Sequence, residues 1–196
     1  MELRVFDIID GITKLGPGIR FGIWTQGCPR RCPGCMTSNS QPLDGGYLVG
    51  VDELVKRIQK SQRTELTISG GEPFLQAKAL VELITKLRSH NEIGVIVYTG
   101  YTYDELQNSK DDSYMELLQL CDLIIDGAYE ETLNDGKNLR GSSNQKAILL
   151  TDKYIDFAKE IGTKPAEIEF FVREDRISMV GVPTREILER MKNTSF

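Results

Sequence analysis

The stretch Cys28-Pro29-Arg30-Arg31-Cys32-Pro33-Gly34-Cys35 directly follows a short apolar run, 21–25, that is typical of a β-strand. Its three cysteines stand in the order C-x-x-x-C-x-x-C on the loop that leaves this strand. Thiolates are the preferred protein ligands of iron-sulfur clusters and of zinc. The spacing therefore predicts a metal centre on this loop.

The kind of metal centre depends on how many ligands the chain provides. A closed zinc site needs four, and the remaining candidates, Cys121 and His90, lie far from the motif in sequence. A 4Fe-4S cubane held by three cysteines keeps one iron open for an exogenous ligand. We therefore favour Cys28, Cys32 and Cys35 as ligands of a 4Fe-4S cluster. A zinc knuckle completed by Cys121 or His90 and a disulfide are the alternatives, and we expect Cys121 to be a buried core residue.

Strand and helix patterns alternate along most of the chain. Apolar and β-branched runs predict strands at 3–9, 20–25, 65–69, 93–98 and 123–126. Apolar residues at helical spacing predict a helix at 51–61 and others between the later strands. This alternation indicates an α/β fold with a mostly parallel sheet, whose ligands bind outside the carboxyl ends of the strands. Glycine-containing loops follow these strands at 70–73, 98–101 and 126–127, so we expect them at the same rim as the cysteines.

Length and charge exclude several classes of protein. The 196 residues are within the size of one domain, and we expect a single domain over 1–196. A net charge of −5 offers no electrostatic surface for nucleic acid. We find no apolar run of membrane-spanning length and no signal-peptide pattern, and the cysteine usage fits a reducing compartment, so we expect a cytoplasmic protein.

The core motifs occupy about 16–150, and a C-terminal extension follows at 151–196. Its patterns predict a helix at 152–161, strands at 167–172 and 177–182, and a last helix at 184–191. We expect this extension to complete the sheet or to cover the site.

The cysteine stretch resembles the cluster motif of the radical S-adenosylmethionine enzymes, and Gly70-Gly71-Glu72-Pro73 resembles their second signature. Further segments in the same order resemble the activating enzymes of anaerobic ribonucleotide reductase, namely 16–20 (GPGIR), 26–28 (QGC), 98–101 (YTGY), 126–127 (DG) and 140–145 (RGSSNQ). The chain departs from the family pattern at two places. Arg30 stands where many members carry a histidine, and Met36-Thr37 replaces a polar pair.

The resemblance implies a partial (β/α) barrel and a specific chemistry. A 4Fe-4S cluster on Cys28, Cys32 and Cys35 would bind S-adenosylmethionine at its open iron. A flavodoxin-like or other one-electron donor would reduce the cluster, and cleavage of S-adenosylmethionine would give a 5'-deoxyadenosyl radical. That radical would generate a glycyl radical on a partner enzyme, the anaerobic ribonucleoside-triphosphate reductase. No catalytic residue is expected beyond the two cofactors.

We expect the residues at the cofactor to share one property, their position in or beside these motif loops: Gly34, Met36, Gly70, Gly71, Glu72, Tyr98, Thr99, Asp126 and Ser142. Ser142 lies in a long polar segment, 128–145, which is otherwise interpreted as a solvated turn. Arg30 and Arg31 are interpreted as a solvated face or as a contact for an acidic partner. Two other functions stay open: a radical enzyme acting on a different glycyl-radical enzyme, peptide or small molecule, and a non-catalytic metal-binding module.

Overall fold

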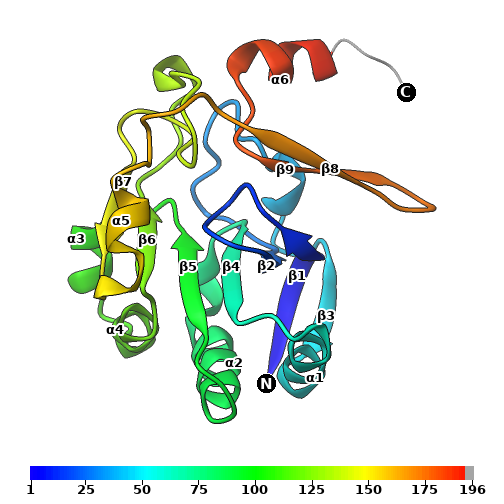
Figure 1. Ribbon diagram of the computed structural model, residues 1–196, viewed down its shortest axis with the longest axis vertical. Helices are drawn as coiled ribbons and strands as arrows, with labels where there is room; N and C mark the ends of the chain where they lie inside the picture. The colour runs from blue at the N-terminus through cyan, green and yellow to red at the C-terminus, as the bar shows by residue number, and fades with distance from the viewer. Residues whose placement is uncertain (193–196) are drawn as a thin grey trace.

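The computed structural model describes residues 1–192, and its main element is a seven-stranded sheet (Figure 1). The strands are β1 (Glu2–Ile12), β2 (Arg20–Thr25), β3 (Tyr47–Gly50), β4 (Glu65–Gly70), β5 (Gly94–Tyr98), β6 (Leu123–Asp126) and β7 (Lys146–Leu149). The helices are α1 (Val51–Ser61), α2 (Ala77–Arg88), α3 (Tyr103–Gln107), α4 (Asp112–Gln119), α5 (Ile155–Ala158) and α6 (Arg185–Lys192). No helix in this described part is long and apolar enough to cross a bilayer.

The sheet is parallel at its centre and antiparallel at its flanks. Its strand order is β3-β1-β2-β4-β5-β6-β7, with β3 and β7 at the edges. The pairings among β2, β4, β5 and β6 are parallel, whereas β1, β3 and β7 run against their neighbours. The predicted α/β class is confirmed. The sheet is mixed because only the central strands belong to strand-helix-strand units.

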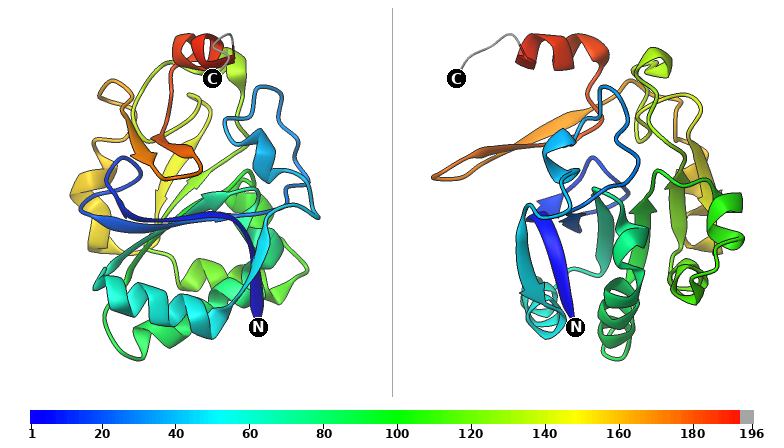
Figure 2. Two further views of the ribbon diagram at one scale, coloured as in Figure 1. Left: turned by 90° about the vertical axis from the view of Figure 1, so that its right-hand side faces the viewer. Right: turned by 180° about the vertical axis from the view of Figure 1, so that it is seen from behind.

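One face of the sheet is covered by α1, α2 and α4, which bury their apolar sides in a common core (Figure 2). In α1 the buried residues are Val51, Leu54, Val55 and Ile58, which confirms the predicted helix at 51–61. Leu66 and Ile68, two residues apart on β4, belong to the same core. The 3.6-residue period of the helix and the two-residue period of the strand thus meet at one interface.

The other face of the sheet is covered in two separate parts. Beside β6, Tyr154 and α5 pack against Ile96 and its neighbours. Beside β1, Phe171 and Val180 of the C-terminal extension pack against Trp24 and its neighbours. The extension therefore covers the sheet on the side that carries Trp24 of β2.

The extension forms its own two-stranded antiparallel sheet, β8 (Ile168–Val172) with β9 (Ile177–Gly181). The buried carboxylate of Asp7 in β1 anchors this hairpin: it accepts hydrogen bonds from Arg173 (2.8 Å), Arg176 (3.2 Å) and Ser178 (2.9 Å). The hairpin stays separate from the seven-stranded sheet.

The predicted helix at 152–161 is wrong in its extent. A 3-10 turn, Asp152–Tyr154, leads into α5, which ends at Ala158. After that residue the backbone bonds span three residues, from Glu160 N–H to the Phe157 oxygen and from Ile161 N–H to the Ala158 oxygen. Such bonds form turns and do not continue an α-helix.

Arg20 is the largest fully buried side chain and lies at the start of β2. Its guanidinium donates to Thr67 Oγ1 (2.6 Å), Glu65 Oε2 (2.6 Å), the Leu66 oxygen (2.7 Å), the Pro17 oxygen (3.1 Å) and Tyr154 Oη (3.3 Å). Its charged carbon also lies 5.4 Å from the centre of the Tyr154 ring. Arg20 thus joins the first loop, β4 and the start of the extension.

Candidate functional site

Two loops carry the predicted motifs, and backbone atoms join them. Gly27 follows β2 with φ +97, a left-handed conformation that favours glycine, and its N–H donates to the Ser40 oxygen (2.7 Å). The Gly27 oxygen accepts from the N–H of Glu72 (2.8 Å), and Gly71 N–H donates to the Thr25 oxygen (2.7 Å). The cysteine loop is therefore fixed directly against the glycine loop that follows β4.

Replacement of Gly71 by alanine is expected to push these two loops apart. Its Cβ would lie 2.2 Å from the Gly27 oxygen and 2.8 Å from the Ser40 oxygen, which are backbone atoms and cannot rotate away. We expect a loss of about 1–3 kcal/mol in the free energy of unfolding and a lower iron content after anaerobic reconstitution. Denaturant unfolding and iron analysis measure these two effects.

Gly50→Ala is the matched control for Gly71→Ala, because no other group lies within 4 Å of a Cβ at Gly50. Equal iron contents and equal unfolding midpoints in the two variants would show that the contact between the loops does not matter.

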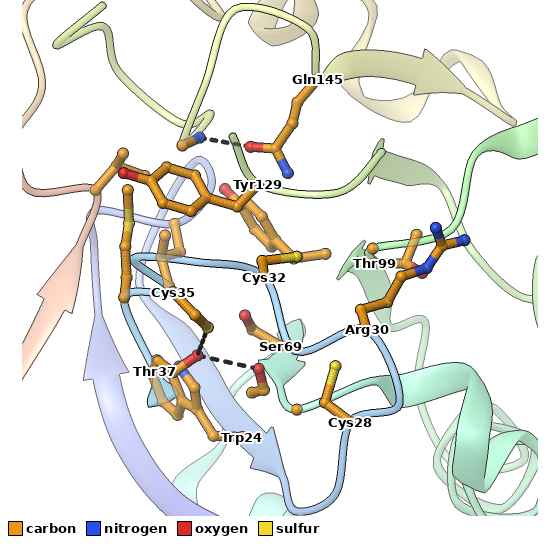
Figure 3. Close-up of a pocket in the computed structure, with 18 of the residues that line it drawn as sticks. Trp24, Cys28, Arg30, Cys32, Cys35, Thr37, Ser69, Thr99, Tyr129 and Gln145 are labelled. Atoms are coloured by element: carbon orange, nitrogen blue, oxygen red, sulfur yellow. Dashed lines mark hydrogen bonds between the residues drawn. The ribbon is translucent and has the colours of Figure 1, made fainter. Parts of the chain in front are cut away.

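The three motif cysteines line one pocket (Figure 3). Cys28, Cys32 and Cys35 are free, half-buried thiols. The Thr37 hydroxyl lies 3.8 Å from the Cys35 sulfur and donates to the Gly70 oxygen (3.2 Å), so it links the third cysteine to the glycine loop. The thiols therefore face a shared cavity.

The arrangement of ligands in this pocket differs from that of a closed zinc site. Among the described residues, no three His, Cys, Asp or Glu side chains are placed to hold one metal ion. A structural zinc ion needs four ligands within roughly 2.0–2.3 Å of a single atom. Three half-buried thiols around one pocket fit a 4Fe-4S cubane, whose ligands bind separate iron atoms.

The two residues that would have completed a zinc site lie elsewhere. Cys121 is only 1% exposed and donates to the Leu117 oxygen (3.1 Å), which confirms its predicted core position. His90 is exposed beyond the end of α2, where its N–H donates to the Leu87 oxygen. Neither side chain is among those that line the pocket.

Five predicted cofactor residues line the pocket together with the cysteines: Met36, Gly70, Gly71, Tyr98 and Thr99. They come from the cysteine loop and from the carboxyl ends of β4 and β5. Burial raises the pKa of the Tyr98 hydroxyl, so this group stays neutral. The rim expected from strand order therefore brings these motif loops together.

Glu72 is fully buried beside the pocket and supports its wall. Its carboxylate accepts hydrogen bonds from Phe74 N–H (3.0 Å), the Thr99 hydroxyl (2.8 Å) and Gly100 N–H (2.8 Å). Burial raises the pKa of Glu72 to about 7, and these three hydrogen bonds oppose that shift. Glu72 thus ties the glycine loop to the loop after β5, and it does not itself line the pocket.

Asp126 and Ser142 are predicted to lie at the cofactor, but the structure places neither of them in the pocket lining. Asp126 accepts from the N–H groups of Tyr103 (2.7 Å) and Lys146 (3.2 Å), so its carboxylate is used in holding α3 and β7. Ser142 is completely buried, and its hydroxyl accepts from Glu130 N–H (3.1 Å). Neither lines the pocket, because local backbone donors take up their oxygens.

Gly34 is also outside the pocket lining, although it lies between two cysteines. It has φ +70, and a Cβ there would lie 2.5 Å from the Glu131 side chain. The glycine therefore serves the turn of the cysteine loop and its contact with Glu131.

Arg30 lines the pocket, so the expected solvated face is wrong for this residue; Arg31 is exposed as expected. The Arg30 guanidinium forms an ion pair with Glu105 (2.5 Å) and lies 4.6 Å from the centre of the Tyr101 ring. Glu105 also caps α3 through Thr102. The sequence contained both the arginine and the capping box but no signal that they would meet.

Sequence reasoning also missed Gln145 and the segment 179–183 in the pocket wall. The Gln145 amide accepts from Gly141 N–H (2.7 Å) and donates to the Gly127 oxygen (2.7 Å), so it joins two loops that both line the pocket. Gln145 belongs to the RGSSNQ motif, in which the hydroxyl of Ser142 is the predicted cofactor contact. The segment 179–183 gave no signal, because its role depends on the packing of the extension.

Comparisons with known proteins match most of the chain to iron-sulfur proteins. A family model described as a 4Fe-4S single cluster domain matches residues 14–148. The anaerobic ribonucleoside-triphosphate reductase-activating protein of Enterobacteria phage T4 is 31% identical over 70% of this chain and 88% of its own length. The protein of the same name from Vibrio cholerae serotype O1 is 30% identical over 66% of this chain and 87% of its own.

A more distant relative, the pyruvate formate-lyase-activating enzyme of Clostridium pasteurianum, is 28% identical over 56% of this chain and 45% of its own length. The matched range 14–148 contains the cysteine loop, the glycine loop and the other rim loops described above. The chain therefore belongs to the family of anaerobic ribonucleoside-triphosphate reductase-activating proteins, and it is a radical S-adenosylmethionine enzyme that uses a 4Fe-4S cluster.

Proposed function

We propose that this enzyme generates a glycyl radical on an anaerobic ribonucleoside-triphosphate reductase. The observation that supports this proposal is the meeting of Cys28, Cys32 and Cys35 with the Gly70-Gly71 loop in one pocket. When bound, the reduced 4Fe-4S cluster would supply one electron for cleavage of S-adenosylmethionine to methionine and a 5'-deoxyadenosyl radical, and hydrogen abstraction from a glycine of the reductase would follow.

The residues of the chain hold the two cofactors and keep water away from them. The three thiols are the cluster ligands in this proposal. Gly70 and Gly71 have no side chain, so their backbone groups can contact S-adenosylmethionine directly. Trp24, Met36 and Val180 provide apolar surface in the pocket, which excludes water from a reactive carbon radical. The wall held by Glu72 keeps the loop after β5 in place.

Electron paramagnetic resonance tests the proposed function. The protein is reconstituted anaerobically with iron and sulfide and incubated with S-adenosylmethionine, a one-electron reductant and its cognate reductase. We expect a glycyl radical signal on the reductase and one deoxyadenosine for each radical formed. Deoxyadenosine without a radical on a competent reductase would indicate a different target, such as another glycyl-radical enzyme, a peptide or a small molecule.

We further propose that a flavodoxin-like donor reduces the cluster and that nucleic acid is not a partner. In this proposal the sheet acts as a partial (β/α) barrel, the chain forms one domain, and the described part of the extension, 151–192, covers the site. A cytoplasmic location stays a prediction.

A further inference from the structure

The β8–β9 hairpin exposes three large apolar side chains on one face. Phe170 is 55% exposed, Val172 77% and Ile177 63%. Val172 lies opposite Ile177, and Phe170 lies opposite Met179. Directly opposed residues, and residues two apart on one strand, share a face of a sheet. These side chains therefore form one strip along the hairpin, which we call the outer face.

The opposite face of the hairpin is firmly attached to the rest of the protein. Phe171 and Val180 pack into the cluster around Trp24. The Glu169 carboxylate accepts from both the N–H (2.7 Å) and the hydroxyl (3.0 Å) of Thr13. With Asp7 holding the far end of the hairpin, the outer face is presented in a fixed position.

The outer face leads directly to the pocket. Met179 belongs to the outer face and also lines the pocket, together with the following residues 180–183. The apolar strip thus runs from the tip of the hairpin to the wall of the pocket that the cysteines line. Single exposed apolar residues are common on proteins, but a contiguous patch that continues into a pocket marks a binding surface.

We propose that the outer face, formed by Phe170, Val172, Ile177 and Met179, is the docking surface for the glycine-bearing segment of the reductase. This inference rests on the proposed function. A protein substrate must bring a main-chain glycine into the pocket. The residues on either side of that glycine must then lie against the surface next to the pocket. The outer face is the apolar surface that adjoins the pocket at Met179, so apolar side chains that flank the glycine could pack on it.

The position of the hairpin in the chain supports a role in choosing the partner. It lies at 168–181, beyond the residues 14–148 matched by the 4Fe-4S family model. The matched range already contains every predicted ligand and the glycine loop. An electron donor needs only to approach the cluster, whereas the reductase has to insert a segment of chain, so a surface continuous with the pocket fits the reductase.

The triple variant Phe170→Thr, Val172→Thr, Ile177→Thr tests this docking surface. Threonine keeps the strand preference and removes most of the apolar surface. We expect the concentration of reductase that gives half-maximal radical formation to rise on the order of tenfold, which corresponds to about 1.4 kcal/mol of binding free energy. Deoxyadenosine formation without reductase is expected to match the wild type, because none of the three residues lines the pocket.

Ile155→Thr is the matched control. Ile155 is 45% exposed on α5, which lies on the opposite side of the molecule from the hairpin in Figure 1. We expect this variant to activate the reductase at the wild-type concentration. Hydrogen exchange provides a second measurement on the unmodified protein: amides of 168–181 should become protected when the reductase is added.

The outcomes separate this inference from the proposed function. If the wild type forms no radical on the reductase, the proposed function fails. If the wild type forms the radical and the triple variant has the same half-saturating concentration, or the hairpin gains no protection, the docking surface is wrong. A change confined to the concentration of the electron donor, or to self-association, would also overturn it.

Discussion

Alanine at Cys28, Cys32 or Cys35 will reduce deoxyadenosine formation from S-adenosylmethionine to the level measured without protein. In the proposed ligand set each substitution removes the one protein ligand of an iron atom, and the described residues offer no fourth cysteine at the pocket. The fold should persist, because these thiols are half-buried in a loop and lie outside the apolar core. Iron and sulfide analysis measures the cluster content, and chromatography measures deoxyadenosine. Circular dichroism shows whether the fold persists.

Cys121→Ala is the control for this series. Its thiol is buried in the core and bonded to the Leu117 oxygen, so its loss should cost about 1 kcal/mol of stability and leave cluster content unchanged. Full cluster content and activity in any of the three motif variants would refute the ligand assignment. Loss of the cluster in Cys121→Ala would show that this thiol reaches the metal after all.

Replacement of Arg20 by methionine will produce the largest loss of stability outside the site. Methionine is of similar length but donates no hydrogen bond, so the buried acceptors of Thr67 and Leu66 and the partly exposed carboxylate of Glu65 lose the Arg20 donor. Removing one member of a buried ion pair typically costs about 3–5 kcal/mol. For a chain of this size we expect the melting temperature to fall by roughly 6–20 °C in a thermal scan.

Arg63→Met is the matched control for Arg20→Met. Arg63 pairs with Asp10 at 2.7 Å, but the two side chains are 31% and 43% exposed. Exposed pairs contribute ~0–1 kcal/mol, so this variant should melt close to the wild type. Similar melting temperatures for the two variants would mean that the buried network around Arg20 contributes no more than a surface pair.

Most of the fold could be predicted because its signals are local. The helix at 51–61 follows from the spacing of Val51, Leu54, Val55 and Ile58, which depends only on neighbouring residues. The antiparallel flanks and the separate β8–β9 sheet could not be predicted, because strand partners are chosen by packing between distant segments.

The candidate site was predictable where a motif loop directly follows a central strand. The cysteines, Gly70 and Thr99 meet in the pocket for this reason. Polar side chains with several possible partners were harder to place: Asp126 and Ser142 accept from backbone N–H groups and do not line the pocket. Residue types show which groups can donate or accept hydrogen bonds, but the pairing of these groups depends on how distant segments pack.

The contacts of Arg20 come from segments that emerge at different times during synthesis. A chain that grows from its N-terminus presents this cation early, and Glu65, its charge partner, follows 45 residues later. Tyr154, whose hydroxyl and ring complete the surroundings of the cation, emerges only after every strand of the seven-stranded sheet has been made. A nascent chain halted before Tyr154 would have the Arg20 guanidinium only partly enclosed, because the hydroxyl and the ring of Tyr154 would be missing. We therefore expect stalled intermediates to be the species that chaperones and proteases capture.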